Sequence, residues 1–289
     1  MLQNVGRRAA DLLSTKVLRS GMQGGIFRPM AEPMVLGVVF LFAICFGSFI
    51  NVLIYRLPRR ESLITPGSRC PKCGQPIEIY DNIPLLSYIM LGGRCRNCRD
   101  KISMRYPLVE LAAGVLAVFS IYYFGLTLRG FEAIFLSFVF LAIFFIDLDF
   151  RIIPDGFTLP GIVIGLGLSF VPGAFVGWKE ALIGIAVGGS AFYLVGLLGE
   201  LLFKKEAMGF GDVKLAAMMG AFLGWQNLLL ILILASFLGS VVGIGLVLFS
   251  RRQARSTYIP FGPFLVLAAV IAMYAGERII RAYLGLIHV

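Results

Sequence analysis

Asp147 and Asp212 are the residues of this chain whose type and position point most directly to chemistry. Asp147 comes at the end of one apolar stretch, and Asp212 opens another within the sequence Gly-Phe-Gly-Asp. An acidic side chain at a membrane edge is costly, which favours a functional role. Two carboxylates held close together in a partly dry site share a proton, so that one acts as a base and the other as an acid. Such a pair could activate a water molecule for attack on a peptide carbonyl.

The sequence around Asp212 also permits a structural interpretation. Asp212 could cap its helix, or it could pair with Lys214 or Arg151. Gly-x-Gly-Asp by itself is a match of only four residues. Gly209 and Gly211 favour the catalytic interpretation, because residues without a Cβ atom let the backbone pass close to a substrate and adopt positive φ. A second acid on the same membrane face would strengthen that interpretation.

Other ionisable residues have simpler explanations. We expect Asp155 to be the N-cap of the helix that follows it, and Asp149 could be a solvated acid at the membrane interface. Glu110 and Glu132 lie near the starts of apolar stretches and are predicted to be structural. His288 is the only histidine, which excludes a Ser-His dyad, a His-Glu-x-x-His zinc site and a histidine proton relay. Hydrolysis would therefore rest on carboxylates or thiols.

Four of the five cysteines lie in one polar segment, residues 56–106, as two Cys-x-x-Cys pairs: Cys70 with Cys73, and Cys95 with Cys98. This spacing lets four thiolates close a tetrahedron around zinc. Two disulfides are the main alternative and a redox role the minor one, but the basic loop indicates the reducing cytoplasm, where disulfides rarely persist. Four protein ligands would close the site, so we expect structural Zn²⁺.

The composition predicts an all-α polytopic membrane protein. The chain has 289 residues, of which 58% are hydrophobic and only 15% are charged. Several segments approach the roughly 17–25 apolar residues that a spanning helix needs, and the period-2 alternation of a barrel is absent. We predict about eight transmembrane helices, with the zinc-binding loop between the first and the second. The predicted spans are residues 34–55, 107–124, 131–147, 157–177, 180–203, 212–224, 227–249 and 260–284.

These spans place the two aspartates on one face of the membrane. Between Asp147 and Asp212 the chain crosses twice, through 157–177 and 180–203, and an even number of crossings returns it to the same side. The two carboxylates can therefore converge.

The distribution of Lys and Arg predicts which face this is. Basic residues are dense in the loop 56–106, and Arg151, Lys204, Lys205 and residues 251–255 fall on the same side. Basic loops stay in the cytoplasm, so the net charge of +10 reflects topology and does not indicate nucleic-acid binding. Residues 1–33 carry five basic residues that oppose this orientation. These residues could form a helix on the membrane surface, or the start codon could be assigned too far upstream.

The ordered motifs of residues 34–285 resemble those of the bacterial type IV prepilin peptidases. These are bifunctional leader peptidases and N-methyltransferases of pilus and type II secretion systems. The resemblance is carried by residues 47–58, the four-cysteine loop, residues 81–88 and 102–110, Asp147-Leu148-Asp149, Ile153-Pro154-Asp155 and residues 209–214.

The resemblance implies an aspartic protease of the Gly-x-Gly-Asp type with Asp147 and Asp212 as its catalytic pair, supported by Gly209, Gly211 and Lys214. It implies that prepilins or pseudopilins are cut between Gly and usually Phe at the cytoplasmic edge of the bacterial inner membrane. The new N-terminus would then be methylated from S-adenosylmethionine.

By the same resemblance, residues 34–106 would carry the methyltransferase activity and 107–289 the peptidase core, after an N-terminal extension of residues 1–33. Gly93 could be a cofactor-binding position, or it could only shape the zinc turn. Two other functions remain possible from the residues alone. The aspartates could relay protons in a transporter, although no internal repeat is evident, or the chain could be a noncatalytic assembly platform.

Overall fold

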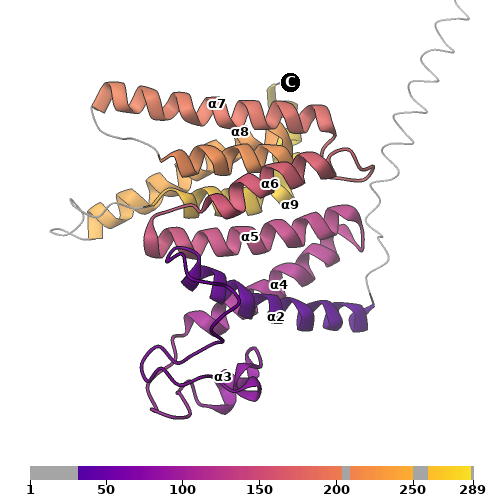
Figure 1. Ribbon diagram of the computed structural model, residues 1–289. Coiled ribbons are helices and arrows are strands. Elements are labelled where there is room, and N and C mark those ends of the chain that lie inside the picture. The colour runs from indigo at the N-terminus through magenta and orange to yellow at the C-terminus, as the bar shows by residue number, and fades with distance from the viewer. Residues whose placement is uncertain (1–31, 204–208, 250–259, 288–289) are drawn as a thin grey trace, which may run out of the picture.

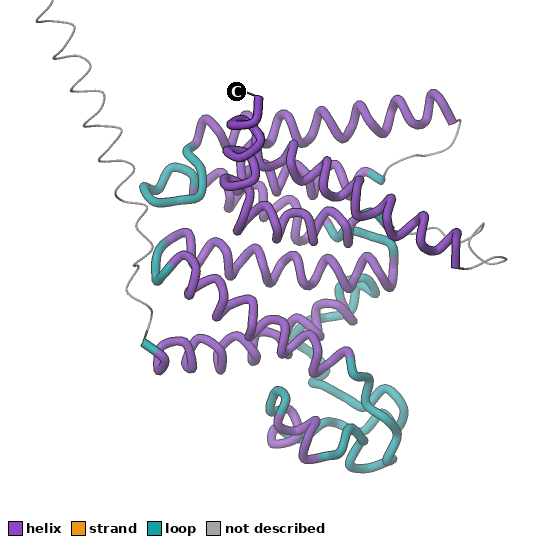
Figure 2. Tube along the Cα trace, turned by 180° about the vertical axis from the view of Figure 1, so that it is seen from behind, coloured by secondary structure: helices purple, strands orange, loops and turns teal. Residues whose placement is uncertain are grey.

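The computed structural model describes residues 32–203, 209–249 and 260–287, and these residues form an all-helical protein (Figure 1). The long helices lie side by side in a stack, and the loop between α2 and α4 protrudes from it (Figures 1 and 2). The elements are α2 (Pro33–Arg56), η1 (Ile79–Asn82), α3 (Leu86–Met90), α4 (Arg105–Phe124), α5 (Leu128–Phe150), α6 (Asp155–Leu168), α7 (Trp178–Phe203), α8 (Phe210–Phe249) and α9 (Gly262–Ile287). The predicted extension 1–33, apart from its last two residues, lies outside the described residues, as do Lys204, Lys205, 251–255 and His288.

The predicted fold class is confirmed. Within the described ranges, six helices are long and apolar enough to cross a membrane: α2, α4, α5, α7, α8 and α9. The four cysteines lie between the first and second of them. Pairing of β type in the described residues is limited to two isolated β-bridges, both in the cysteine loop.

The predicted span 157–177 was too long. Helix α6 has 14 residues and ends at Leu168. The Ser169 hydroxyl bonds back to the carbonyl of Leu166 at 2.6 Å, and Gly173 has a φ of 96°, so the backbone turns instead of continuing as a helix. A helix of this length rises about 21 Å, which is less than the hydrocarbon thickness of a bilayer.

The start of α5 holds the loop that follows α6. The carboxylate of Glu132 accepts the backbone N–H of Phe175 at 2.9 Å, and the Nε of Arg129 donates to the carbonyl of Ala174 at 3.1 Å. These bonds satisfy backbone groups that no helix pairs. The structural interpretation of Glu132 is therefore confirmed.

Two predicted spans, 212–224 and 227–249, correspond to the two parts of α8. The 40 residues of α8 include one non-helical position, Gly224, with φ 77° and ψ 167°. A straight helix of that length would measure about 60 Å, twice the thickness of a bilayer core. Glycine tolerates this positive φ because it has no Cβ atom.

Packing shows that the chain reverses at Gly224. The first part of α8 begins next to the start of α9, because Asp212 and Phe261 line one cavity. The second part runs antiparallel to α9, since Gly239 lies against Phe264 and, farther along α9, Asn227 lies against Gly276. The two parts of α8 therefore run in opposite directions (Figure 1).

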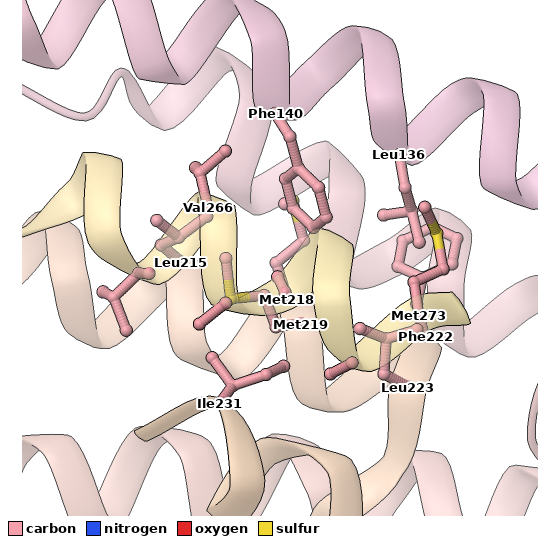
Figure 3. Packing of buried hydrophobic residues seen from close by; sticks show 14 of the residues in the cluster. Leu136, Phe140, Leu215, Met218, Met219, Phe222, Leu223, Ile231, Val266 and Met273 are labelled. Atoms are coloured by element: carbon pink, nitrogen blue, oxygen red, sulfur yellow. The ribbon is translucent and has the colours of Figure 1, made fainter. Parts of the chain in front are cut away.

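A buried cluster joins α5, α8 and α9 (Figure 3). In this view helix α9 lies between α5 and α8, and helix α8 contributes most of the labelled side chains. The labelled residues are Leu136 and Phe140 from α5, Leu215, Met218, Met219, Phe222, Leu223 and Ile231 from α8, and Val266 and Met273 from α9. Leu215 is fully buried in this core one turn after Asp212, so packing holds the start of α8 in place.

Helices α7 and α8 approach closely through glycines, and this contact gives a testable prediction. A Cβ atom on Gly184 would collide with the backbone of Gly220, whereas one on Gly189, also in α7, would meet nothing within 4 Å. We expect Gly184→Val to destabilise the protein by at least about 2 kcal/mol, because the helix backbones must separate. Thermal unfolding in detergent measures this, with Gly189→Val as the matched control. Equal melting temperatures for the two variants would contradict it.

Candidate active site

The structure brings Asp147 and Asp212 together at one cavity of about 250 Å³. The cavity lies where α5 ends and where α8 and α9 begin. Its other lining residues are Arg151, Ile152, Ile153, Gly209, Gly211, Pro260 and Phe261. The prediction that the two aspartates converge is therefore confirmed.

Asp147 lies in the last turn of α5 and is only 5% exposed. The helix ends because Arg151 takes the left-handed conformation, with φ 58° and ψ 39°, and donates its backbone N–H to the Asp147 carbonyl at 2.9 Å. The backbone N–H of Gly262 hydrogen-bonds to the Asp147 carboxylate. The Asp147 side chain is therefore held from two elements.

Gly262 was missed by sequence reasoning. A Cβ atom at Gly262 would collide with the Asp147 carboxylate, so only glycine lets the start of α9 come this close. The signal that could have revealed it is the sequence Pro-Phe-Gly-Pro at residues 260–263, a turn directly before an apolar helix.

Asp212 lies in the first turn of α8, and its local bonds are reciprocal. Its backbone N–H donates to the Gly209 carbonyl at 3.1 Å, and the Gly209 backbone N–H bonds to the Asp212 carboxylate. The Oδ1 atom of Asp212 is buried and has no hydrogen-bond partner among the described residues. A buried oxygen without a hydrogen-bond partner is unusual. Here, beside a second carboxylate, a proton shared between the two acids or a donor group of a substrate would satisfy it.

The two glycines of the motif have different structural roles. A Cβ atom on Gly211 would lie 2.9 Å from the Cβ of Ile153, so close packing requires glycine there. A Cβ atom on Gly209 would lie 3.7 Å from the nearest oxygen of Asp212, an ordinary contact. Gly211 therefore sets how closely α8 approaches the segment that follows Asp147.

Lys214 points away from the aspartate pair. Its Nζ atom lies 2.7 Å and 2.9 Å from the two carboxylate oxygens of Asp155. The prediction that Asp155 is an N-cap was wrong: Pro154 occupies that position, and the Asp155 side chain instead forms this ion pair with α8. Lys214 thus links α6 to α8 one turn from the cavity.

Asp149 connects the active-site end of α5 to the cysteine-loop side of the molecule. Its carboxylate pairs with Arg105 at the start of α4, so it is not simply a solvated acid. The guanidinium of Arg59 lies 4.0 Å from the ring centroid of Tyr55 and 4.8 Å from that of Phe150. The segment after Asp147 is therefore anchored to both α2 and α4.

The sulfur atoms of Cys70, Cys73, Cys95 and Cys98 lie within 4.8 Å of one another, and all four thiols are free. Zinc–sulfur bonds of 2.3 Å in a tetrahedron imply sulfur separations of about 3.8 Å. The sulfurs of Cys70 and Cys98 are 3.8 Å apart. This cluster could bind a metal ion, and its donor set fits Zn²⁺.

Both Cys-x-x-Cys pairs lie in the same kind of turn. The backbone N–H of Cys70 bonds to the Gln75 carbonyl and that of Cys95 to the Asp100 carbonyl, each at 2.9 Å. Backbone N–H groups of Cys73 and Lys72 lower the pKa of the Cys70 thiol to about 7. These backbone groups therefore favour the thiolate form of Cys70, the form in which a cysteine binds a metal ion.

Gly93 lies next to this cluster and behind Tyr88. It has a φ of 67°, and a Cβ atom there would lie 2.9 Å from the Tyr88 hydroxyl. Tyr88, but not Gly93, lines a second cavity of about 800 Å³ between the loop and helices α2 and α4. Gly93 therefore does not line this cavity; the side chain of Tyr88 lies against it and forms the wall.

Comparison with known proteins covers both halves of the chain. Residues 41–124 match the bacterial peptidase A24 N-terminal domain, and residues 134–244 match the type IV leader peptidase family. No solved structure matches this chain.

Curated relatives match over most of their length, and each bears the name prepilin leader peptidase/N-methyltransferase. The protein of Aeromonas salmonicida strain A449 is 40% identical over 275 residues, covering 86% of this chain and 94% of the relative. That of Aeromonas hydrophila is 41% identical over 271 residues, covering 86% and 93%. That of Pseudomonas aeruginosa is 38% identical over 267 residues, covering 84% and 91%. With helices that could span a membrane, two acids at one cavity and a four-cysteine cluster, this chain belongs to the type IV leader peptidase family.

Proposed function

We propose that Asp147 and Asp212 are the catalytic carboxylates with which this bacterial membrane enzyme, a prepilin leader peptidase/N-methyltransferase, cuts type IV prepilins. The observation that carries this proposal is that both carboxylates line one small cavity at the meeting point of α5, α8 and α9. Family membership supports an enzyme over the transporter and platform alternatives.

The carboxylate pair supplies the acid and the base for peptide hydrolysis. The ionised carboxylate takes a proton from water as the water oxygen attacks the scissile carbonyl carbon. The protonated partner supports the developing oxyanion and then gives its proton to the leaving amine. The open Oδ1 atom of Asp212 and the Gly262 N–H that holds Asp147 fit these unequal roles. Gly211 supports the site by its close packing, and Lys214 by its pair with Asp155.

Charge supports an active site on the cytoplasmic face of the inner membrane. Within the described residues, the basic side chains of the cysteine loop and Arg151 lie on the side of the aspartates. Fewer basic side chains lie toward the opposite helix ends: Arg129, Lys179, Arg278 and Arg281. Short basic loops remain in the cytoplasm. A prepilin or pseudopilin with a basic leader, its apolar segment in the bilayer, would then present its Gly–Phe bond at this cavity.

The second activity belongs to the region from α2 through the cysteine loop, residues 34–106, with residues 107–289 as the peptidase core. When bound there, S-adenosylmethionine would supply the methyl group for the amine that cleavage exposes. Zn²⁺ would be held by the four cysteines without an open coordination position, so it would stabilise the fold of the loop and take no part in catalysis.

Mass spectrometry of a prepilin incubated with the purified chain and S-adenosylmethionine tests this function. We expect loss of the leader peptide and addition of a methyl group to the new N-terminus. A prepilin that keeps its leader under conditions in which the chain is folded would refute the proposal.

A further inference from the structure

A second cavity in the described part of the chain lies between the cysteine loop and the cytoplasmic ends of α2 and α4, as assigned above. Its volume of about 800 Å³ lies in the range of sites that enclose drug-sized ligands. The cavity at the aspartates has about 250 Å³. The larger cavity can therefore hold a molecule of nucleoside size.

Glu110 of α4 lines this cavity and is buried, with 8% of its surface exposed. One of its oxygens accepts the backbone N–H of Leu85 at 2.8 Å, and the Ser48 side chain also bonds to it. Among the described residues no ion pair includes Glu110. These hydrogen bonds fix the position of the Glu110 side chain. They do not offset the full free-energy cost of burying an ionised carboxylate that has no cation as a partner. A positively charged ligand would supply the partner.

The other lining residues narrow the choice of ligand. Asp81 is already neutralised by two bonds from Arg96, at 2.6 Å and 2.7 Å. Glu110 is thus the buried acid left to face a cation. Tyr88 and Tyr106 add aromatic rings that can stack on a planar base or lie against a cation.

We propose that this cavity binds S-adenosylmethionine, with Glu110 facing its cationic groups. The proposal rests on the methyltransferase activity proposed above. S-adenosylmethionine combines a planar adenine with a sulfonium, an ammonium and a carboxylate group. The aromatic rings and the buried carboxylate of Glu110 match the first three, and the basic residues that line the same cavity match its carboxylate. These residues are Arg56, Arg69, Lys72, Arg96 and Lys101. Arg105, next to the lining residue Tyr106, pairs with Asp149, two residues after Asp147, so an ion pair links the edge of this cavity to the active-site end of α5.

Gly93 gains a role in this arrangement without touching the ligand. Its carbonyl accepts the Ile102 N–H at 2.8 Å, and its N–H donates to the Tyr88 carbonyl at 2.9 Å. A methyl group on Gly93 would press on the Tyr88 hydroxyl, which bonds to the sulfur of Met104 at 2.8 Å. Gly93 is therefore a positioning residue for the Tyr88 wall of the cavity.

Equilibrium binding of S-adenosylmethionine to the full chain in detergent, measured by calorimetry, tests the proposal. We expect Glu110→Gln to weaken binding at least about tenfold, because the charge is lost while an acceptor for Leu85 remains. Glu132→Gln is the matched control. Glu132 is 3% exposed and also accepts one backbone N–H, but it lies near the start of α5, at the end of that helix away from Asp147 and the cysteine loop. Its affinity should equal that of the wild type.

A second pair of variants guards against misfolding of the Glu110 variant. Gly93→Ala should weaken binding several-fold, whereas Gly92→Ala should not, although both positions have positive φ, because a Cβ atom on Gly92 meets nothing within 4 Å. Zinc content shows that the loop remains folded in both.

If the wild type binds and neither Glu110→Gln nor Gly93→Ala weakens binding, the cavity assignment is wrong while the methyltransferase activity stands. If the folded wild type neither binds S-adenosylmethionine nor transfers its methyl group, the proposed methyltransferase function fails as well.

Discussion

Asp147→Asn and Asp212→Asn are each expected to lower the rate of prepilin cleavage by at least about 1,000-fold. Asparagine keeps the size of the side chain, but it can neither take a proton from water nor give one to the leaving amine. Because both carboxylates line the same cavity, loss of either one removes half of the acid–base pair. Single-turnover cleavage of a purified prepilin in detergent measures the effect.

Asp155→Asn is the control for this result. Asp155 lies near the cavity but pairs with Lys214, so its loss weakens the link between α6 and α8 without removing an acid or a base. We expect cleavage to be retained at a reduced level. If Asp155→Asn were as inactive as Asp212→Asn, the loss would reflect structure and not acid–base chemistry.

Cys70→Ser is expected to remove the bound metal from the cysteine loop. Structural zinc contributes on the order of 10 kcal/mol to the folding of such units, and a hydroxyl is a poor replacement for a thiolate ligand. Zinc per chain, measured by plasma mass spectrometry, should fall from about one to near zero. Binding of S-adenosylmethionine should fall with it, since the loop forms one wall of the cavity.

Cys45→Ser provides the matched comparison, because Cys45 lies exposed on α2 and outside the four-cysteine cluster. Its zinc content should be that of the wild type. A Cys70→Ser protein that keeps its full zinc content would show that the four sulfurs do not hold the metal.

Hydropathy predicted most helices because lipid-facing and buried residues in a membrane protein are both apolar. Helices α2, α4, α5, α7 and α9 lie within a few residues of their predicted spans. The prediction also separated the two parts of α8, since Gly220 and Gly224 interrupt the apolar run. It made α6 too long, because residues 169–177 are apolar enough to continue a helix, although Gly173 adopts a positive φ.

The site was predictable only where one segment carried the signal. Asp212 stands in a recognisable motif, and counting helices gave it Asp147 as a partner. The pair between Asp155 and Lys214 joins residues 59 positions apart, so a local capping rule could not anticipate it. The contact of Gly262 with Asp147 is equally nonlocal.

The larger cavity could not be predicted from the sequence either, because residues far apart in the chain form it. Its walls come from α2, the cysteine loop and α4, and Glu110 had looked like an ordinary structural acid near the start of a span. Only the folded chain shows that it is buried beside a space of nucleoside size and without a cation.

One measurement tests the central claim, that Asp147 and Asp212 cut the prepilin while a separate cavity serves methyl transfer. Asp212→Asn is incubated with S-adenosylmethionine and an equal mixture of intact prepilin and already processed, unmethylated pilin, and the products are weighed by mass spectrometry. The account predicts that the prepilin keeps its leader while the processed pilin gains a methyl group. Removal of the leader at the wild-type rate would contradict it.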